Sequence, residues 1–197
     1  GIELAHGGLF IPCSGWMNSP ALCHYLIDHP RISLITSTKA DELVFDGTHW
    51  RVGQYVAPVV ILAASHRLNE FEQTKHLPIK LIYGQMTQIR ATQESCFLKI
   101  PVCAQGHVLP QRNGTHYLGA TYNLGISDAQ TTAQDNAVNK EKAQLIAPST
   151  NWSNEVTGQW AGVRVATPDY LPLLGPIANA KEFLTRYTGL HSNSKRW

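Results

Sequence analysis

The chain has 197 residues; 43% of them are hydrophobic, 15% are charged, and the formal net charge at pH 7 is +2. This composition excludes an intrinsically disordered chain, which would combine few apolar residues with a large net charge. The absence of a Lys/Arg run argues against a chain that holds nucleic acid by itself, and the longest apolar stretch, residues 59–64, is far shorter than the roughly 20 residues of a membrane helix.

The first element predicted along the chain is a helix over residues 20–28. Ser19 before Pro20 is typical of a helix start, since a serine side chain caps free backbone N–H groups and proline fits the first helical position. Pro30 then ends the helix. Residues 32–36 form a short β-rich run, which predicts a strand.

A hairpin and a buried strand are predicted next. Residues 43–45 and 49–52 flank Asp46-Gly47, a pair that fits a two-residue turn with positive φ. Residues 59–64 form a continuous apolar run that ends in small side chains. This pattern is typical of a strand that is buried on both faces, as in a parallel sheet.

After residue 78 the pattern changes to strands with a single helix. A long strand over residues 79–89, interrupted by Gly84, comes first, and a turn is predicted at residues 112–114. Helical spacing of apolar positions predicts a helix over residues 135–146. The other predicted strands cover residues 96–100, 106–109, 116–122 and 156–165. This order predicts an α+β fold, with a mostly antiparallel sheet and flanking helices.

The cysteines and histidines show no metal-binding pattern. The four cysteines, at positions 13, 23, 96 and 103, match no Cys-x-x-Cys or zinc spacing, and the nine histidines include no His-Glu-x-x-His arrangement. We therefore expect free thiols in a reducing cytoplasm and no metal site.

One long motif resembles a known family. Residues 162–175 read Gly-x-Arg-x-x-Thr-x-Asp-x-x-Pro-x-x-Gly, which is similar to the signature of the FAD-dependent amine oxidases of the D-amino-acid oxidase and glycine oxidase superfamily. Residues 8–23, 77–85 and 106–122 resemble segments of the same superfamily in order and spacing. Within it, they are most similar to the oxidoreductase half of bacterial bifunctional enzymes that modify the wobble uridine of tRNA.

The resemblance implies a domain organisation and a cofactor. Residues 1–76 would be the trailing part of a Rossmann-like FAD domain, with the meander and the buried strand. Residues 77–165 would be the substrate domain, and residues 166–197 would return toward the FAD domain and end in a truncated tail. The cofactor would be FAD. Because the sequence contains no Gly-x-Gly, and so lacks the turn that cradles the FAD pyrophosphate, we expect this chain to be an internal piece that binds FAD weakly or not at all and is inactive by itself.

The resemblance also implies roles for individual residues. Arg164 would bind the substrate carboxylate, and His107 would help to hold it at a position where relatives have tyrosine. For Arg164 the alternative is an ion pair with Asp169. For His107 it is a histidine that simply lies on a strand surface. The residues implied to contact FAD are Ala40, Ala64, Ser65, Gly84 and Gln85. For Gly84 the alternative is a β-bulge, and for Ala64 and Ser65 it is core packing.

The implied reaction is the oxidative removal of the carboxymethyl group from 5-carboxymethylaminomethyl-(2-thio)uridine at the wobble position of tRNA, which gives aminomethyl-uridine. The partners would be tRNA, bound through the longer protein, and an S-adenosyl-L-methionine-dependent methyltransferase half in the same chain, with neither membrane nor metal. Two alternatives stay open: an oxidase of free glycine or D-amino acids, and a non-catalytic degenerate chain.

Overall fold

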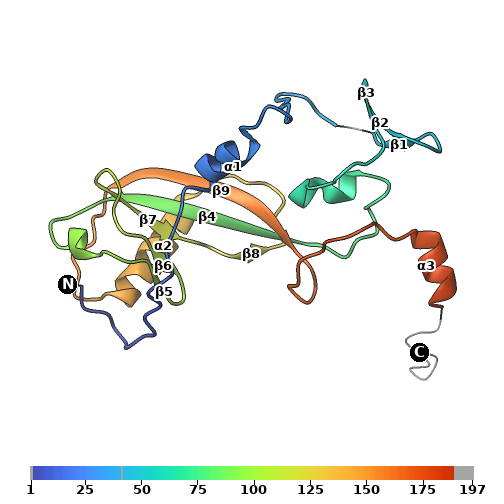
Figure 1. The fold of residues 1–197 in the computed structure, drawn as a ribbon. Coiled ribbons are helices and arrows are strands. Elements are labelled where there is room, and N and C mark those ends of the chain that lie inside the picture. Colours follow the sequence, from blue (N-terminus) through green and yellow to red (C-terminus); the bar gives the residue numbers. More distant parts are fainter. Residues whose placement is uncertain (1, 41, 189–197) are drawn as a thin grey trace. The chain divides into compact units, whose positions relative to one another are not determined.

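The computed structural model describes residues 2–40 and 42–188, and the chain divides into two compact units (Figure 1). Unit 1 comprises residues 1–37 and 81–164, and unit 2 comprises residues 38–80 and 165–197. The sequence-based division instead grouped residues 1–76. The start of the chain joins unit 1 because the backbone N–H of Ala5 donates to the carbonyl of Ile146 (2.9 Å) and the ring of Trp16 packs near that of Tyr117 (6.5 Å between centroids).

Unit 1 is built on a six-stranded sheet, in which the two long strands β4 and β9 run side by side (Figure 1). The strand order is β5-β6-β7-β4-β8, and β9 pairs with β4. The pairings β4–β7, β4–β8, β5–β6 and β6–β7 are all antiparallel, so the predicted α+β class is confirmed. The strands are β4 (Lys80–Arg90), β5 (Val102–Cys103), β6 (His107–Val108), β7 (Thr115–Gly119), β8 (Asn123–Leu124) and β9 (Val156–Ala166).

One predicted strand of this unit is a helical turn instead. Residues 96–100 were expected to be extended, but Ser95–Phe97 forms the short 3-10 helix η2. The backbone N–H of Thr92 donates to the Ser95 hydroxyl oxygen (2.8 Å), and the N–H of Ser95 donates to the Thr92 hydroxyl oxygen (3.0 Å). These reciprocal bonds offer the backbone an alternative to strand pairing, which the apolar pattern could not show.

Each of the three α-helices in the described residues begins at a capping side chain. In α1 (Ser19–Ile27) the cap is Asn18, one residue before the predicted Ser19, and its side chain accepts from the N–H of Ala21 (3.0 Å). In α2 (Ala133–Ile146) Thr132 caps by accepting from the N–H of Asp135 (3.0 Å). Asn179 does the same for α3 (Ala180–Arg186). Such caps satisfy N–H groups that have no partner within the helix.

The core of unit 1 lies between the sheet and α2. It contains Ile89, Leu98, Val108, Leu118, Ala143, Ile146 and Ala147. The face that α2 buries is partly polar, however, since Asn136 and Asn139 lie on it with Ala143 and Ile146, whereas the apolar Leu145 is 57% exposed.

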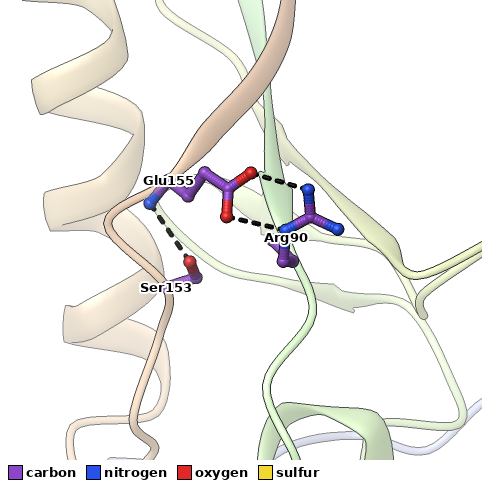
Figure 2. Close-up of polar contacts among 3 residues, drawn as sticks. All are labelled: Arg90, Ser153 and Glu155. Carbon is purple, nitrogen blue, oxygen red and sulfur yellow. Dashed lines mark hydrogen bonds and ion pairs between the residues drawn. The ribbon is translucent and has the colours of Figure 1, made fainter.

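An ion pair joins the end of β4 to the segment that leads into β9 (Figure 2). Arg90 donates from Nε to Glu155 Oε2 (2.6 Å) and from its terminal nitrogen to Oε1 (2.7 Å), and its backbone N–H donates to the Glu155 carbonyl (3.1 Å). The Ser153 hydroxyl oxygen accepts from the Glu155 N–H (3.1 Å). The Arg90 hydrogen bond holds the pKa of Glu155 below its usual value. The paired ends fix the register in which β9 begins.

Unit 2 contains a separate three-stranded antiparallel sheet. Its strands are β1 (Val44–Phe45), β2 (Trp50–Val52) and β3 (Tyr55–Ala57), in that order. The predicted hairpin is confirmed, but its loop has four residues, 46–49, because Phe45 pairs with Trp50. Asp46 Oδ1 accepts from the N–H groups of Thr48 (3.0 Å) and His49 (2.8 Å) and so closes the loop. These bonds lower the pKa of Asp46.

Two other predicted strands do not form. Residues 32–36 and 59–64 have no strand assignment, and the side chains of Val59 and Ile61 are 71% and 86% exposed. A strand needs neighbouring strands to satisfy its backbone, and a strand that is apolar on both faces also needs cover for both. The described strands of unit 2 pair only with one another and supply neither, so the prediction of a buried strand at 59–64 is wrong for this structure. This segment leads instead into the 3-10 helix η1 (Ser65–Glu70).

Candidate functional site

The sheet of unit 1 has one face covered by α2 and one that α2 leaves uncovered. Along β4 the side chains of Gln85, Thr87 and Ile89 are buried under α2, whereas those at Gly84, Met86 and Gln88 alternate with them and are only half-buried. Successive strand residues point to opposite faces. We call the face that carries residues 84, 86 and 88 the open face.

His107 lies on the open face. It pairs with Gly119 across β6 and β7, and Gly119 is so close to both His107 and Met86 that a β-carbon at this glycine would overlap the imidazole and the Met86 sulfur. The half-buried ring has its pKa lowered, first by burial and second by the charge of Lys142. At neutral pH His107 is therefore an uncharged hydrogen-bonding group rather than a cation, similar in this respect to a tyrosine hydroxyl.

Arg164 lies on the same face, at the far end of β9. Gly158 sits against the Gln88 side chain, so residues 158, 160, 162 and 164 face the open side. The Arg164 side chain is exposed, and its guanidinium carbon lies 5.7 Å from the centre of the Tyr122 ring. Among the described residues Arg164 forms no ion pair with a carboxylate. Its N–H groups are thus available to an external anion.

The two predicted substrate residues share a face without touching. Between β6 and β9 lie β7 and β4, which at about 4.8 Å per strand spacing separates the two backbones by roughly 14 Å. A ligand that meets both Arg164 and His107 must therefore extend across the sheet.

Gly84 and Gln85, both predicted to contact the flavin, are packed against other parts of unit 1. A β-carbon at Gly84 would lie 2.8 Å from the carbonyl oxygen of Thr121, so glycine allows a close approach of backbone at this point. The side chain of Gln85 is 0% exposed and points to the covered face. Its Oε1 accepts from the N–H of Thr132 (2.7 Å), and its Nε2 donates to the Thr132 carbonyl (2.9 Å) and to Asn136 Oδ1 (2.8 Å).

Sequence reasoning missed this polar network under the sheet. Asn136 Oδ1 also accepts from the Thr87 hydroxyl (2.8 Å), and Asn139 Nδ2 donates to the Gln85 carbonyl (2.8 Å). The buried amides dock the first turns of α2 onto β4. The available signal was the alternation of β4, which places the polar Gln85 and Thr87 on the same face as the apolar Ile89, since polar residues need hydrogen-bond partners when they are buried.

The other residues predicted to contact FAD lie in unit 2. Ala40 and Ser65 are exposed and Ala64 is half-buried; Ser65, with a φ of 50°, begins η1. These side chains offer one hydroxyl group, and the part of unit 2 that the structure describes has no glycine-rich turn leading into a long helix. The fit to FAD is therefore partial: Gly84 and the small side chains allow a close approach of backbone, but the pyrophosphate lacks a cradle in the described residues.

The four cysteines are free thiols, as predicted. Within the described ranges no group of three or more His, Cys, Asp or Glu side chains could hold a metal ion. No helix of the described residues has the length and apolar character needed to cross a membrane.

The Gly119 contact predicts how the position of His107 can be changed. Alanine at position 119 should displace the imidazole from Met86 and toward solvent, because the new methyl group would occupy its place. The pKa of His107, followed by NMR titration, should then rise toward its ordinary value. Gly15→Ala is the control, since a β-carbon there meets nothing within 4 Å. An unchanged His107 pKa in Gly119→Ala would contradict this geometry.

A second prediction concerns the stability of unit 1 at low pH. His116 is 0% exposed; its Nδ1–H donates to the Leu109 carbonyl (2.9 Å), and its Nε2 accepts from the Ser95 hydroxyl (2.9 Å). Burial lowers its pKa, as it does for His107. As the pH falls, these histidines are therefore protonated in the unfolded chain before they are protonated in the folded chain. Their contribution to the free energy of unfolding is complete above a pH of about 6.5 and is lost as the pH drops below it. Urea unfolding from pH 7.5 downward measures this; His116→Gln should reduce the slope, and an equal slope would contradict it.

Comparison with known proteins was consistent with the motif. A protein-family model described as FAD dependent oxidoreductase matches residues 2–193. The tRNA 5-methylaminomethyl-2-thiouridine biosynthesis bifunctional protein MnmC of Legionella pneumophila (strain Lens) is 51% identical over 197 residues, which is 100% of this chain and 30% of that protein. The protein of the same name from Stutzerimonas stutzeri (strain A1501) is 36% identical over 208 aligned positions, or 100% of this chain and 32% of that protein.

A solved structure with a similar fold is glycine oxidase from Geobacillus kaustophilus. It superposes with a TM-score of 0.61 at 20% identity, over 72% of this chain and 40% of that one. The likeness supports the fold alone. The chain spans about a third of the length of the curated relatives that it matches.

Proposed function

Because this chain belongs to the FAD-dependent oxidoreductase family, we propose that it is part of a longer oxidoreductase that modifies the wobble uridine of tRNA. The proposed reaction is the oxidative removal of the carboxymethyl group from 5-carboxymethylaminomethyl-(2-thio)uridine, which gives aminomethyl-uridine. The support comes from the names of the relatives, which are bifunctional proteins of tRNA 5-methylaminomethyl-2-thiouridine biosynthesis. Such a role belongs in the cytoplasm.

The exposed guanidinium of Arg164 is the observation that carries the proposal. The carboxymethylaminomethyl group of the substrate is an N-substituted glycine, and a guanidinium can hold its carboxylate with two parallel hydrogen bonds. Arg164 has no carboxylate partner among the described residues, and it lies on the open face. We assign the carboxylate to Arg164, and to neutral His107 a contact farther across the same ligand.

When bound, FAD supplies the two-electron oxidation of the glycyl carbon–nitrogen bond, after which hydrolysis releases glyoxylate. This chain's residues would orient the glycyl group by fixing its carboxylate, and no protein nucleophile is required. We propose Gly84, Ala40, Ala64 and Ser65 as places where backbone or small side chains admit the cofactor. For Gln85 only an indirect contribution is compatible with its hydrogen bonds to α2.

The 197-residue chain itself is expected to bind FAD weakly or not at all and to be inactive. Its sequence has no Gly-x-Gly-x-x-Gly turn to receive the pyrophosphate. Titration of the purified chain with FAD, followed by flavin fluorescence, measures the affinity. Tight, saturable binding, or a yellow protein after purification, would contradict this expectation.

The whole reaction is tested in the full-length, FAD-loaded protein. Glyoxylate release is measured from tRNA that carries the carboxymethylaminomethyl group and, separately, from free glycine. The proposal predicts release from the tRNA and little from glycine; the reverse would support the alternative of a free amino acid oxidase, and no release from either would support a non-catalytic protein. Methylation of the product by another part of the same protein is a further part of the proposal.

A further inference from the structure

Tyr122 occupies a fixed position on the open face, directly after Thr121. The backbone N–H of Thr121 donates to the Gln85 carbonyl (3.2 Å), and its hydroxyl oxygen accepts from the Gln85 N–H (3.0 Å). Gln85 is in turn held by α2. The residue before Tyr122 is therefore tied to the buried centre of the sheet, whereas the Tyr122 ring remains 46% exposed.

A contact that restricts the conformations of the Arg164 side chain would favour ligand binding. An exposed arginine samples many rotamers, and a ligand that binds it must order the side chain at an entropic cost. In the described residues no carboxylate orders Arg164, but its guanidinium carbon lies 5.7 Å from the Tyr122 ring centre, within the range of a cation–π contact.

We infer that Tyr122 is a positioning residue, whose ring holds the Arg164 guanidinium ready for the substrate carboxylate. A ring that contacts the face of the guanidinium leaves the N–H groups, which lie in its plane, free to form the two parallel bonds to a carboxylate. The inference rests on the proposed function, because it takes Arg164 as the group that binds the carboxylate. It adds a residue that lies outside the motif of residues 162–175.

The contact can be measured in the 197-residue chain without cofactor or activity. The Nε–H resonance of Arg164 should show an upfield ring-current shift in the wild type and in Tyr122→Phe, which keeps the aromatic face. Tyr122→Leu keeps an apolar side chain of moderate size but has no such face, so the shift should be lost. An unchanged Arg164 resonance in Tyr122→Leu would overturn the inference.

The functional consequence is measured in the full-length, FAD-loaded protein with carboxymethylaminomethyl tRNA. Tyr122→Leu should raise KM about two- to fivefold, the range expected from an exposed cation–π contact, with little change in kcat, and Tyr122→Phe should behave as the wild type. Tyr25→Ala, which removes an exposed ring on α1, is the matched control.

Three outcomes separate the inference from the function on which it rests. If Arg164→Ala lowers kcat/KM about a hundredfold or more and Tyr122→Leu raises KM whereas Tyr122→Phe does not, both stand. If Arg164→Ala has this effect but Tyr122→Leu has the wild-type KM, the inference alone is overturned. If Arg164→Ala keeps full turnover, the carboxylate role of Arg164 fails and the inference fails with it.

Discussion

Alanine at position 164 is expected to lower kcat/KM for the carboxymethylaminomethyl substrate about a hundredfold or more in the full-length, FAD-loaded protein, or roughly 3 kcal/mol. The reason is that the variant loses both parallel hydrogen bonds to the carboxylate. FAD content should stay at the wild-type level, since Arg164 is assigned to the substrate and not to the cofactor. Steady-state glyoxylate release and the flavin absorbance per protein measure the two quantities separately.

Two further variants make this result specific. Arg164→Lys keeps the charge but loses the planar fork, so its activity should lie between those of the wild type and the alanine variant. Arg112→Ala removes an exposed arginine at the bridge of residues 112 and 115 and should have no effect. Full turnover in Arg164→Ala with FAD retained would show that another group binds the carboxylate.

Alanine at position 85 is expected to destabilise the fold by roughly 3 kcal/mol. The loss of the Gln85 side chain would leave Asn136 Oδ1 without one donor and the cap residue Thr132 without both of its bonds to Gln85. Buried polar groups that lose their partners bear the full cost of desolvation. Urea unfolding of the chain, followed by circular dichroism, measures the change in the free energy of unfolding, and hydrogen exchange should show the loss first in the initial turns of α2.

Gln88 offers a matched control for this change. It lies three residues farther along the same strand, so its side chain is on the open face, where it contacts Gly158. Gln88→Ala should cost much less than Gln85→Ala. Equal destabilisation by the two variants would contradict the role assigned to the buried amide network.

The long elements of unit 1 could be predicted because their own residues determine them. The alternation in β4, the position of β9 and the extent of α2 all follow from local patterns. The strand predicted at residues 59–64 depends on neighbours, and the described part of unit 2 supplies none, so its apolar side chains remain exposed. The 3-10 helix η2 depends on two hydroxyl groups that an apolar pattern does not register.

One residue of the candidate site, Arg164, is marked by a sequence motif, whereas the surroundings of the site depend on packing. Arg164 was identified through a sequence motif, and the structure shows it exposed on the open face. The charge of His107 could not be predicted from the sequence, because burial, followed by the charge of Lys142, lowers its pKa and favours the neutral ring. Tyr122 could not be predicted, because only the folding of β7 against β4 brings it to Arg164.

The binding of the substrate carboxylate by Arg164 is tested most directly by altering the substrate. Glyoxylate release by the full-length, FAD-loaded protein is compared for tRNA with the carboxymethylaminomethyl group and for the same tRNA as its methyl ester, with hydrolysis of the ester monitored separately. The ester has no negative charge for Arg164 to bind, so we predict that its kcat/KM falls about a hundredfold. Equal turnover of the acid and the ester would contradict the claim.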